Sequence, residues 1–354
     1  MKRYGYIYEN VCDLENIKLA ILKASLGKRQ QHRIRNILLN INHYAVNVRE
    51  LLVNKQYVPS PYKIVTLQDG ANKKERTIFK PKFYPDQVIH WALMLQLEPI
   101  IMKGMYVYNC GSVPKKGTSY GQKALRKWLD TDPKNTKYCF KMDISKFYPS
   151  VGNEILKRMF RKKVKDNDCL WLIDTVIDSS QGLPIGNYTS QWFSNFFLQG
   201  LDHFIKEDLG VKYYIRYVDD LVLLGSNKKK LHKARMEIEK YLNNIELKIK
   251  SNWQVFKVNS RAIDFLGFRF FRNKTIVRKI NALRIKRRIN KISKKNHLNY
   301  KDASAIISYW GWIKRSNSYG FYCKNIKEKV SLKKAKRTVS EHAKTNSIRR
   351  NTSF

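Results

Sequence analysis

Three aspartates stand where carboxylates could do chemistry. Asp219 and Asp220 interrupt an apolar run in KYYIRYVDDLVLL (212–224), and Asp143 ends the strand-like segment KYCFKMD. An isolated carboxylate is costly to remove from water unless a cation compensates it. Two converging carboxylates and a main-chain carbonyl supply the hard oxygen ligands that Mg²⁺ prefers. We therefore expect Asp143, Asp219 and the carbonyl group of Ile144 to bind metal ions.

Two such ions about 4 Å apart can activate an attacking 3′-hydroxyl group and stabilise a departing pyrophosphate. Mn²⁺ is the alternative ion. Side chains alternate between the faces of a strand, so Asp219 and Asp220 should not both be full ligands. We assign the ligand role to Asp219 and expect Asp220 to shape the local field. The competing interpretation is that both residues simply occupy an exposed hairpin turn, as Asp often does.

These carboxylates converge only if their strands are neighbours in one sheet. The segment 212–226 is predicted to form a hairpin, and 137–144 a strand. Apolar residues at three-to-four spacing predict helices around them. Strands and helices in mixed order favour an α+β architecture. The predicted helices span residues 14–24, 32–52, 85–105, 153–164, 185–209, 228–245, 277–295 and 300–321.

Two further hairpins are predicted from short β-rich runs. The segment PYKIVTLQDGANKKERTIFKPK (61–82) has its turn around Asp69, Gly70 and Asn72. The segment DFLGFRFFRNKTIV (264–277) reads as a strand pair. The last residues after Val330 are polar and basic, and we expect them to be too short for another domain.

The charge balance indicates a polyanionic partner. Lys and Arg number 70 against 28 Asp and Glu, which gives a net charge of +42. Such an excess opposes compaction unless a polyanion is bound, with nucleic acid the first expectation and an anionic membrane surface the second. No apolar run approaches the ~18 residues of a membrane span. The five cysteines show no CxxC spacing, which is typical of a reducing cytoplasm without disulfides or a zinc site.

Several segments together resemble reverse transcriptases. YVDD (217–220) resembles their catalytic box and DISKFYPS (143–150) their other aspartate motif. The similarity extends through ERTIFKPKFYPDQVIHWAL (75–93), GLPIGNYTSQWFSN (182–195) and FLGFRF (265–270), in the order of the family. It implies RNA-directed DNA polymerase activity, with Asp143, Asp219 and Asp220 as catalytic residues.

The resemblance also implies a right-hand fold with fingers, a palm built on a small antiparallel sheet, and a helical thumb. We expect residues 1–60 to form a basic helical extension with the fingers, and 61–273 the fingers and palm core. Residues 274–336 would be the thumb, and 337–354 a basic tail.

The resemblance assigns roles at the incoming nucleotide to three side chains. Arg76 resembles the arginine that clamps the triphosphate, and Lys74 would add a second cation. Tyr148 resembles the aromatic gate that packs under the sugar and excludes a 2′-hydroxyl group. The simpler interpretations are solvated surface charges for the two cations and a core aromatic for Tyr148.

Gly267 in FLGF resembles the turn of the primer grip, although an ordinary hairpin glycine has the same sequence signature. The family often carries a lysine before FLGF that can donate a proton to pyrophosphate. Here either Lys248 or Lys250 could hold that position, and the sequence does not decide between them.

One motif departs from the family at large. Most reverse transcriptases have Gln-Gly where this chain has Ile185-Gly186, and Ser-Pro at Ser190-Gln191. Ile185 and Gly186 would line the nucleotide site, and Ile185 cannot make the polar contact of the glutamine. This form resembles reverse transcriptases of diversity-generating retroelements, which copy RNA with errors at adenines. The alternative is that Ile185 only packs the pocket.

The resemblance implies template RNA and a cDNA primer strand as partners, with a small basic accessory variability protein, oligomeric in form. It also implies a cytoplasmic, prokaryotic or phage-encoded protein with no membrane partner. Two other interpretations stay open. One is a retron or defence-associated reverse transcriptase, and the other is a catalytically inactive RNA-binding scaffold.

Overall fold

Four antiparallel strands form the sheet that carries the aspartates. The computed structural model describes the main chain of residues 3–69 and 74–351 and the side chains of 3–68 and 75–344. The strand order is β4-β5-β3-β6. The strands are β3 (Tyr138–Asp143), β4 (Tyr213–Tyr217), β5 (Asp220–Gly225) and β6 (Gln254–Lys257). The predicted hairpin is β4–β5, and the predicted neighbour relation is confirmed because β3 pairs with β5.

Both faces of this sheet are buried, which explains the long apolar run around the aspartates. Phe140, Leu221 and Leu223 belong to one core, whereas Val222 and Leu224 belong to the other. Alternation along each strand thus divides the side chains between two hydrophobic layers. The sheet is therefore a central layer between two hydrophobic cores.

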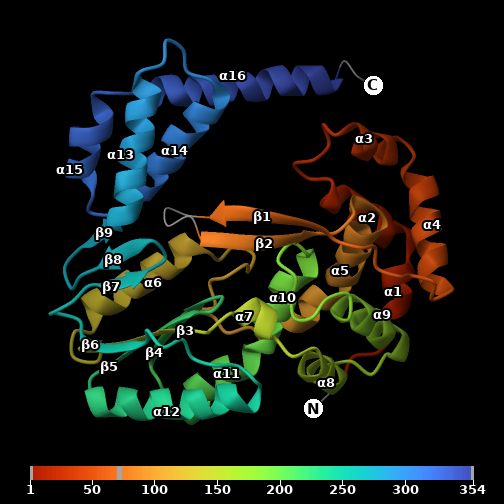
Figure 1. The fold of residues 1–354 in the computed structure, drawn as a ribbon, viewed down its shortest axis with the longest axis horizontal. Helices are drawn as coiled ribbons and strands as arrows, with labels where there is room; N and C mark the ends of the chain where they lie inside the picture. The colour runs from red at the N-terminus through yellow and green to blue at the C-terminus, as the bar shows by residue number, and fades with distance from the viewer. Residues whose placement is uncertain (1–2, 70–73, 352–354) are drawn as a thin grey trace.

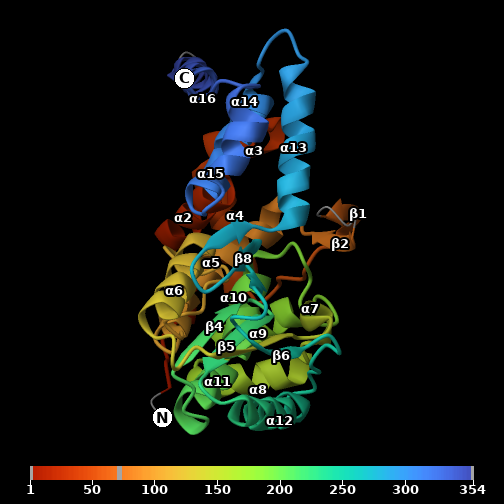
Figure 2. The same cartoon turned by 90° about the vertical axis from the view of Figure 1, so that its left-hand side faces the viewer.

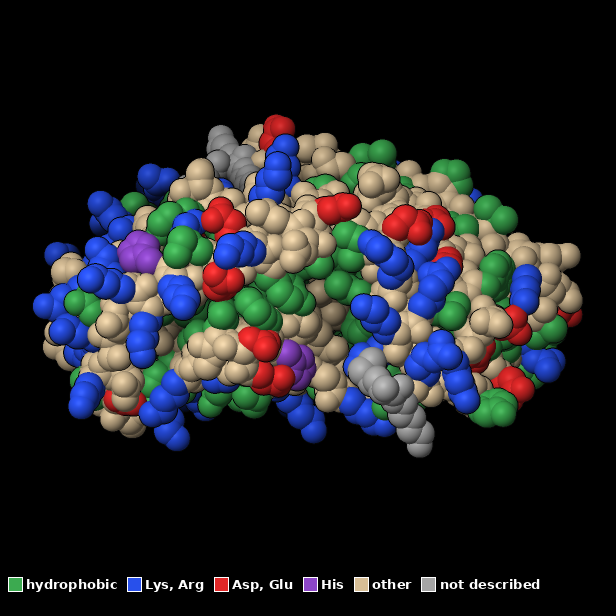
Figure 3. Space-filling model, turned by 90° about the horizontal axis from the view of Figure 1, so that it is seen from below, with side chains coloured by type: hydrophobic (Ala, Val, Ile, Leu, Met, Phe, Trp, Pro, Cys, Tyr) green, Lys and Arg blue, Asp and Glu red, His purple; other side chains and the backbone are tan. Residues whose placement is uncertain are grey.

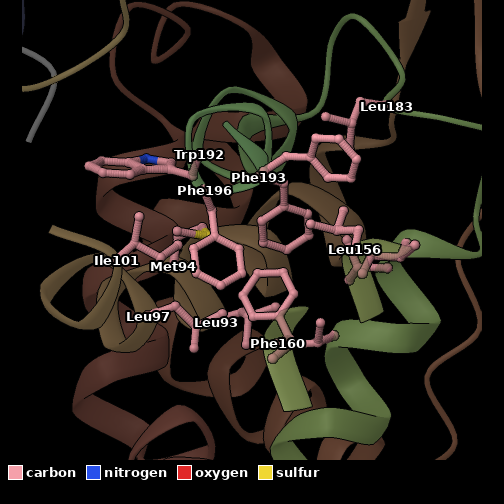
Figure 4. Close-up of a cluster of buried hydrophobic side chains, with 14 of the residues drawn as sticks. Leu93, Met94, Leu97, Ile101, Leu156, Phe160, Leu183, Trp192, Phe193 and Phe196 are labelled. Atoms are coloured by element: carbon pink, nitrogen blue, oxygen red, sulfur yellow. The ribbon is translucent and has the colours of Figure 1, made fainter. Parts of the chain in front are cut away.

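The first layer is made by helices of the segment 88–244 that contribute buried side chains to one core. Aliphatic side chains of α5 meet aromatic side chains of α8 and α10 in the cluster drawn in Figure 4. α12 contacts β3 and β5. These helices are α5 (Val88–Met102), α7 (Phe147–Ser150), α8 (Asn153–Lys163), α9 (Asn167–Ile177), α10 (Tyr188–Phe197), α11 (Gln199–His203) and α12 (Lys228–Asn244).

The predicted helix over 185–209 is divided into pieces. α10 ends at Phe197, α11 follows at Gln199, and a π-helical turn, η2 (Phe204–Asp208), completes the segment. Another π-helical turn, η1 (Phe83–Gln87), precedes α5. The helix α6 (Thr118–Thr131), which the apolar spacing did not indicate, contacts β4.

The N-terminal helices and the first hairpin lie beside the core (Figure 1). α2 contacts α5 and α4. The hairpin pairs β1 with β2 in register, with Leu67 opposite Arg76. Of its predicted turn, Gly70 and Asn72 lie outside the described residues. The elements are α1 (Tyr8–Cys12), α2 (Leu14–Ala24), α3 (His32–Leu39), α4 (Ile41–Val53), β1 (Lys63–Asp69) and β2 (Lys74–Lys80).

The C-terminal lobe rises above the sheet, as Figure 2 shows. The predicted strand pair is a three-stranded sheet, β7 (Ile263–Phe265), β8 (Phe268–Phe270) and β9 (Thr275–Val277). Helices α13 (Lys279–Ser293), α14 (Tyr300–Lys314), α15 (Tyr319–Tyr322) and α16 (Leu332–Asn351) follow, with the π-helical turn η3 (Cys323–Lys327) after α15. The expected polar tail is thus largely helical, and α16 packs on α14.

The molecule has the α+β right-hand arrangement that was expected. The four-stranded sheet and its helices form the palm, the β1–β2 hairpin stands beside it, and α13 to α16 form a helical lobe above it (Figures 1 and 2). Across residues 3–69 and 74–351, no helix is both long and apolar enough to cross a membrane.

Candidate active site

The three aspartates meet at one end of the palm sheet. Asp143, the last residue of β3, is the register partner of Asp220, the first residue of β5. The main-chain N–H of Ile144 donates to the carbonyl oxygen of Asp219 over 3.1 Å. Two segments far apart in the sequence are therefore joined by hydrogen bonds at the carboxylates.

Asp219 is held in a two-residue turn. Tyr217 pairs with Asp220, so Val218 and Asp219 alone connect β4 to β5. Val218 has φ +58°. Two-residue hairpin turns need a positive φ at the first central position, where glycine is usual. The turn is therefore strained at a valine, immediately before the proposed metal ligand.

Lys141 is the cation that meets Asp220. The two residues lie on the same end of the β3–β5 pair, and Lys141 Nζ is 3.4 Å from Asp220 Oδ2. Both side chains are about one-fifth exposed, at 19% and 21%. Lys141 also donates to the carbonyl oxygen of Asp264 on β7. This lysine therefore links the end of the palm sheet that carries the aspartates to β7.

Asp220 sits in an environment that disfavours its charge. Burial raises the pKa of its carboxyl group to about 7, repulsion from Asp143 adds to the increase, and Lys141 opposes it. Asp220 Oδ1 is buried and has no hydrogen-bond partner among the described residues. A buried acceptor without a partner is costly, and a cation or a bound ligand could satisfy it.

The donor chemistry suits a hard cation. Asp143, Asp219 and the carbonyl of Ile144 bring only oxygen atoms to this edge, and Asp220 Oδ1 adds an unsatisfied one. Among the described side chains of residues 3–68 and 75–344, no group of three or more His, Cys, Asp or Glu is arranged to hold a metal ion. The proposed set differs from such a group because it combines two carboxylates with a main-chain oxygen.

The Ile185–Gly186 segment is tied to the hairpin of the fingers. The N–H of Phe79 on β2 donates to the carbonyl of Ile185 over 2.8 Å. Gly186 has φ +140°, and a Cβ atom there would lie 1.9 Å from the carbonyl oxygen of Phe79. Only glycine fits such a close approach. The Ile185 side chain is half-buried. The segment is thus a junction between palm and fingers.

Tyr148 lies on α7, next to the same segment. Its carbonyl oxygen accepts from Leu183 N over 2.8 Å, and its hydroxyl accepts from Ser194 Oγ over 3.4 Å. The side chain is half-buried, and burial raises the pKa of its hydroxyl group. Tyr148 is therefore fixed by both the Gly182–Ile185 loop and α10.

Of the two cations predicted to clamp the triphosphate, the structure describes the side chain of Arg76 but not that of Lys74. Arg76 is exposed on β2, three residues before Phe79. Lys74 begins β2, and its side chain lies outside the described residues. Both cations lie on β2, the strand whose Phe79 N–H donates to the carbonyl of Ile185.

Gly267 forms a turn that the thumb covers. Leu266 and Gly267 connect β7 to β8 with φ of +54° and +81°. The carbonyl of Gly267 accepts from Arg278 N at 3.0 Å and from Asn281 Nδ2 at 3.2 Å. A Cβ atom on Gly267 would lie 2.5 Å from the Trp312 ring. The turn is therefore a hairpin turn whose glycine makes room for α14.

The main chains of Lys248 and Lys250 lie beside the end of β3 that carries Asp143. The carbonyl of Lys248 accepts from Ser145 N over 2.8 Å, and Lys250 N donates to the carbonyl of Asp143 over 2.9 Å. Neither backbone contact assigns a role to an ammonium group, so the choice between the two lysines stays open.

Basic side chains line the first thumb helix. Arg284, Lys286 and Arg287 on α13 are exposed. Arg288 differs from them, because its Nη2 atom pairs with the buried Asp302 at 2.5 Å. Basic side chains are also spread over the face seen from below in Figure 3. Exposed positive charge is therefore not confined to α13, and Arg288 is engaged in holding α13 to α14.

The buried polar groups under the YVDD turn were not among the residues predicted from the sequence. Arg216 and Asp202 are fully buried and pair through Arg216 Nη2 and Asp202 Oδ2 at 2.5 Å. Lys141 was also missed. In the sequence, both cations stand inside apolar strand runs, Arg216 in KYYIRY and Lys141 in FKMD. This position indicates a buried ion pair, because a buried cation requires a partner.

Comparison with known proteins places this site in a family. Residues 73–270, more than half of the chain, match the family described as reverse transcriptase (RNA-dependent DNA polymerase). None of the curated proteins matches at a significant level.

Two solved telomerase structures are similar at low identity. One is apo telomerase from Candida tropicalis truncated from its C-terminal domain, with 15% identity and a TM-score of 0.45 over 63% of this chain and 57% of that one. The other is telomerase from Candida albicans with a TWJ fragment of telomeric RNA, with 11% identity and a TM-score of 0.47 over 76% and 55%. This chain thus spans little more than half of either telomerase chain. The match over residues 73–270, which includes all three aspartates, shows that the chain belongs to the reverse transcriptase family.

Proposed function

We propose that this protein synthesises DNA on an RNA template. The observation that carries the proposal is the pairing of Asp143 with Asp220 in register, with Asp219 hydrogen-bonded through its carbonyl to Ile144. Three carboxylates at one strand end are costly without a cationic ligand. A protein that served only as an RNA-binding scaffold would gain nothing from this unfavourable grouping of carboxylates.

Asp143, Asp219 and the carbonyl of Ile144 would hold Mg²⁺, as two ions, with Mn²⁺ as a substitute. The buried, unpartnered Oδ1 atom of Asp220 is consistent with a cation at this edge. When bound, such ions lower the pKa of a 3′-hydroxyl group and neutralise charge on the departing pyrophosphate. Lys141 would favour the carboxylate form of Asp220 and so oppose the increase in pKa that burial causes.

Side chains around the aspartates would bind and select the nucleotide. Arg76 and Lys74 on β2 would contact the triphosphate, since cations on one strand can be aimed together. Tyr148 would pack against the sugar and exclude ribonucleotides. The net charge of +42 would provide most of the affinity for template and primer. Gly267 would lie along the primer, below the thumb.

We further propose the diversity-generating subtype. Ile185-Gly186 and Ser190-Gln191 support it, because an isoleucine cannot make a polar contact near the nucleotide and selectivity falls when such a contact is missing. Errors would then concentrate opposite template adenines. The protein would work in a prokaryotic cytoplasm with an oligomeric basic accessory protein. A retron or defence-associated enzyme is the alternative, and a low error rate at adenines would favour it.

The test is extension of a DNA primer annealed to a defined RNA template. Wild-type protein with Mg²⁺ and deoxynucleotides should extend the primer, and Asp219→Ala should abolish extension while retaining affinity for RNA. Extension by Asp219→Ala at the wild-type rate would show that the metal assignment is wrong. RNA binding without any wild-type extension would return the chain to the scaffold interpretation.

A further inference from the structure

A charged network lies buried directly beneath the YVDD turn. Arg216 on β4 has no exposed surface, and neither has Asp202 on α11. Arg216 Nε donates to Asp202 Oδ1 over 2.7 Å, and Arg216 Nη2 donates to Asp202 Oδ2 over 2.5 Å. The hydroxyl group of Tyr214 donates to the same Oδ1 atom over 2.7 Å. The fork-to-fork geometry compensates both charges within the core.

The third guanidinium nitrogen of Arg216, Nη1, contacts the β4–β5 turn rather than Asp202. Arg216 Nη1 donates to the carbonyl oxygen of Val218 over 3.0 Å. The same nitrogen lies 3.3 Å from Asn195 Oδ1, which also accepts from Asn109 Nδ2 at 2.9 Å. Arg216 therefore connects a buried ion pair to the residue immediately before Asp219.

The turn that receives this contact is strained. A φ of +58° is uncommon for a residue with a Cβ atom and is an outlier for a β-branched one. Gly111 packs against the turn, and a Cβ atom on Gly111 would lie 2.6 Å from Val218 N. The carbonyl of Gly111 accepts from Asn195 Nδ2 over 2.8 Å. The conformation of Val218 is thus imposed by surrounding groups rather than by its own preference.

We propose that Arg216 is a positioning residue that holds the Val218 turn in its left-handed conformation and so keeps Asp219 beside Asp143. This inference rests on the proposed function for its catalytic consequence. Without the contact from Nη1 to Val218, the turn should relax to a negative φ. Asp219 would then leave the position at which its carbonyl bonds to Ile144.

A purely structural role is the competing explanation, because breaking a buried ion pair destabilises any protein. The variant Arg216→Lys distinguishes a purely structural role from the proposed positioning role. Lysine keeps the charge that compensates Asp202, but its ammonium is a point charge without the planar fork. It cannot contact both Asp202 oxygens and the Val218 carbonyl together. We expect kcat to fall at least tenfold, with the KM for deoxynucleotide changed less than twofold.

The second-site variant Val218→Gly supplies the specific readout. Glycine adopts a positive φ without a steric penalty. In the Arg216→Lys background it should restore kcat at least threefold, although it adds no contact to the core. A core variant with a matched loss of thermal stability, Leu52→Ala on α4, should keep the wild-type kcat below its melting temperature. Leu52 is buried on α4, which packs on α2 and lies far from the β4–β5 hairpin (Figure 1).

Gly111→Ala tests the same turn without touching the ion pair, in case Arg216→Lys does not fold. Its Cβ atom should displace Val218 and lower kcat at least tenfold. The matched control is Gly117→Ala, which meets no atom within 4 Å and should keep the wild-type kcat.

The φ angle of residue 218 in crystal structures of the variants decides the matter independently of activity. It should leave the left-handed region in Arg216→Lys and return to it in the double variant with Val218→Gly. A Val218 that keeps φ near +58° in Arg216→Lys would overturn the inference. Wild-type kcat in both Arg216→Lys and Gly111→Ala would overturn it too. Absence of DNA synthesis by the wild type, with the φ change present, would count against the proposed function alone.

Discussion

Gly186→Ala should separate the Ile185 loop from the fingers and weaken nucleotide binding. The added Cβ atom would lie 1.9 Å from the carbonyl oxygen of Phe79, and real Cβ atoms essentially never approach below 3.0 Å. The two main chains must therefore move apart by about 1 Å. The two atoms closer than 3.0 Å are both backbone atoms of Phe79, so no side chain can rotate away to relieve the contact.

The expected magnitude has a stability part and a binding part. Holding a non-glycine residue at φ +140° costs about 1–3 kcal/mol, and loss of the hydrogen bond from Phe79 N to Ile185 O costs about 1 kcal/mol. We expect the free energy of unfolding to fall by about 2–4 kcal/mol. Because β2 also carries Arg76, a shift of about 1 Å should raise the KM for deoxynucleotide by about 10- to 100-fold.

The assay is steady-state primer extension on an RNA template, with thermal unfolding measured on the same samples. The matched control is Gly210→Ala, because Gly210 also has a positive φ (+59°) but no atom lies within 4 Å of its Cβ position. The control should lose about 1–2 kcal/mol of stability and keep the wild-type KM. A wild-type KM in Gly186→Ala would refute the proposed junction between the loop and β2.

Three further predictions concern other parts of the chain. Burial lowers the pKa of His90 to about 4, so the unfolded state binds its proton first as the pH falls. Stability should therefore drop by about 3 kcal/mol from pH 6.5 to 4, and His90→Leu should remove that component in denaturant titrations. Ile185→Gln should lower errors opposite template adenines about tenfold, through about 1.4 kcal/mol of restored discrimination, as counted by cDNA sequencing. Reversing two charges among Arg284, Lys286 and Arg287 should reduce the slope of log affinity against log salt by about two.

Each of these three predictions has a result that would contradict it. An unchanged pH dependence in His90→Leu would mean that the buried imidazole does not titrate as its environment indicates. Equal adenine error rates, with synthesis intact, would remove Ile185 from the selection of nucleotides. An unchanged salt slope would make the α13 cations a solvated face rather than a phosphate-binding surface.

The secondary structure near the aspartates was predictable because its signals are local. The continuous β-rich apolar runs on both sides of Asp219 and Asp220 predicted the β4–β5 hairpin, and the short turn at YVDD sets its register. α12 was equally clear from its apolar spacing, and in the structure Asn227 Oδ1 caps its first turn by accepting from Lys229 N and Lys230 N. The reverse transcriptase family was identified correctly from its motifs. The retroelement subtype stays a prediction.

Partners that come from distant segments were not predictable from the chain alone. Arg216 could be seen as a cation in an apolar strand, but nothing local shows that Asp202 and Val218 receive its nitrogens. The need for glycine at position 186 arises from Phe79, on another element. The helix α16 was read as a tail because only a narrow apolar side, including the buried Ala335, packs on α14.

Single-turnover incorporation of one deoxynucleotide by Asp143→Asn, compared with Asp130→Asn, tests the central claim most directly. Asp130 lies on α6 and pairs with Arg126 at the surface, so its loss should leave the rate unchanged. Asp143→Asn should slow incorporation on an RNA template by about 1,000-fold or more, a barrier increase of about 4 kcal/mol, while RNA affinity stays within twofold. Incorporation by Asp143→Asn at the rate of Asp130→Asn would contradict the assignment of the palm carboxylates as the site of DNA synthesis.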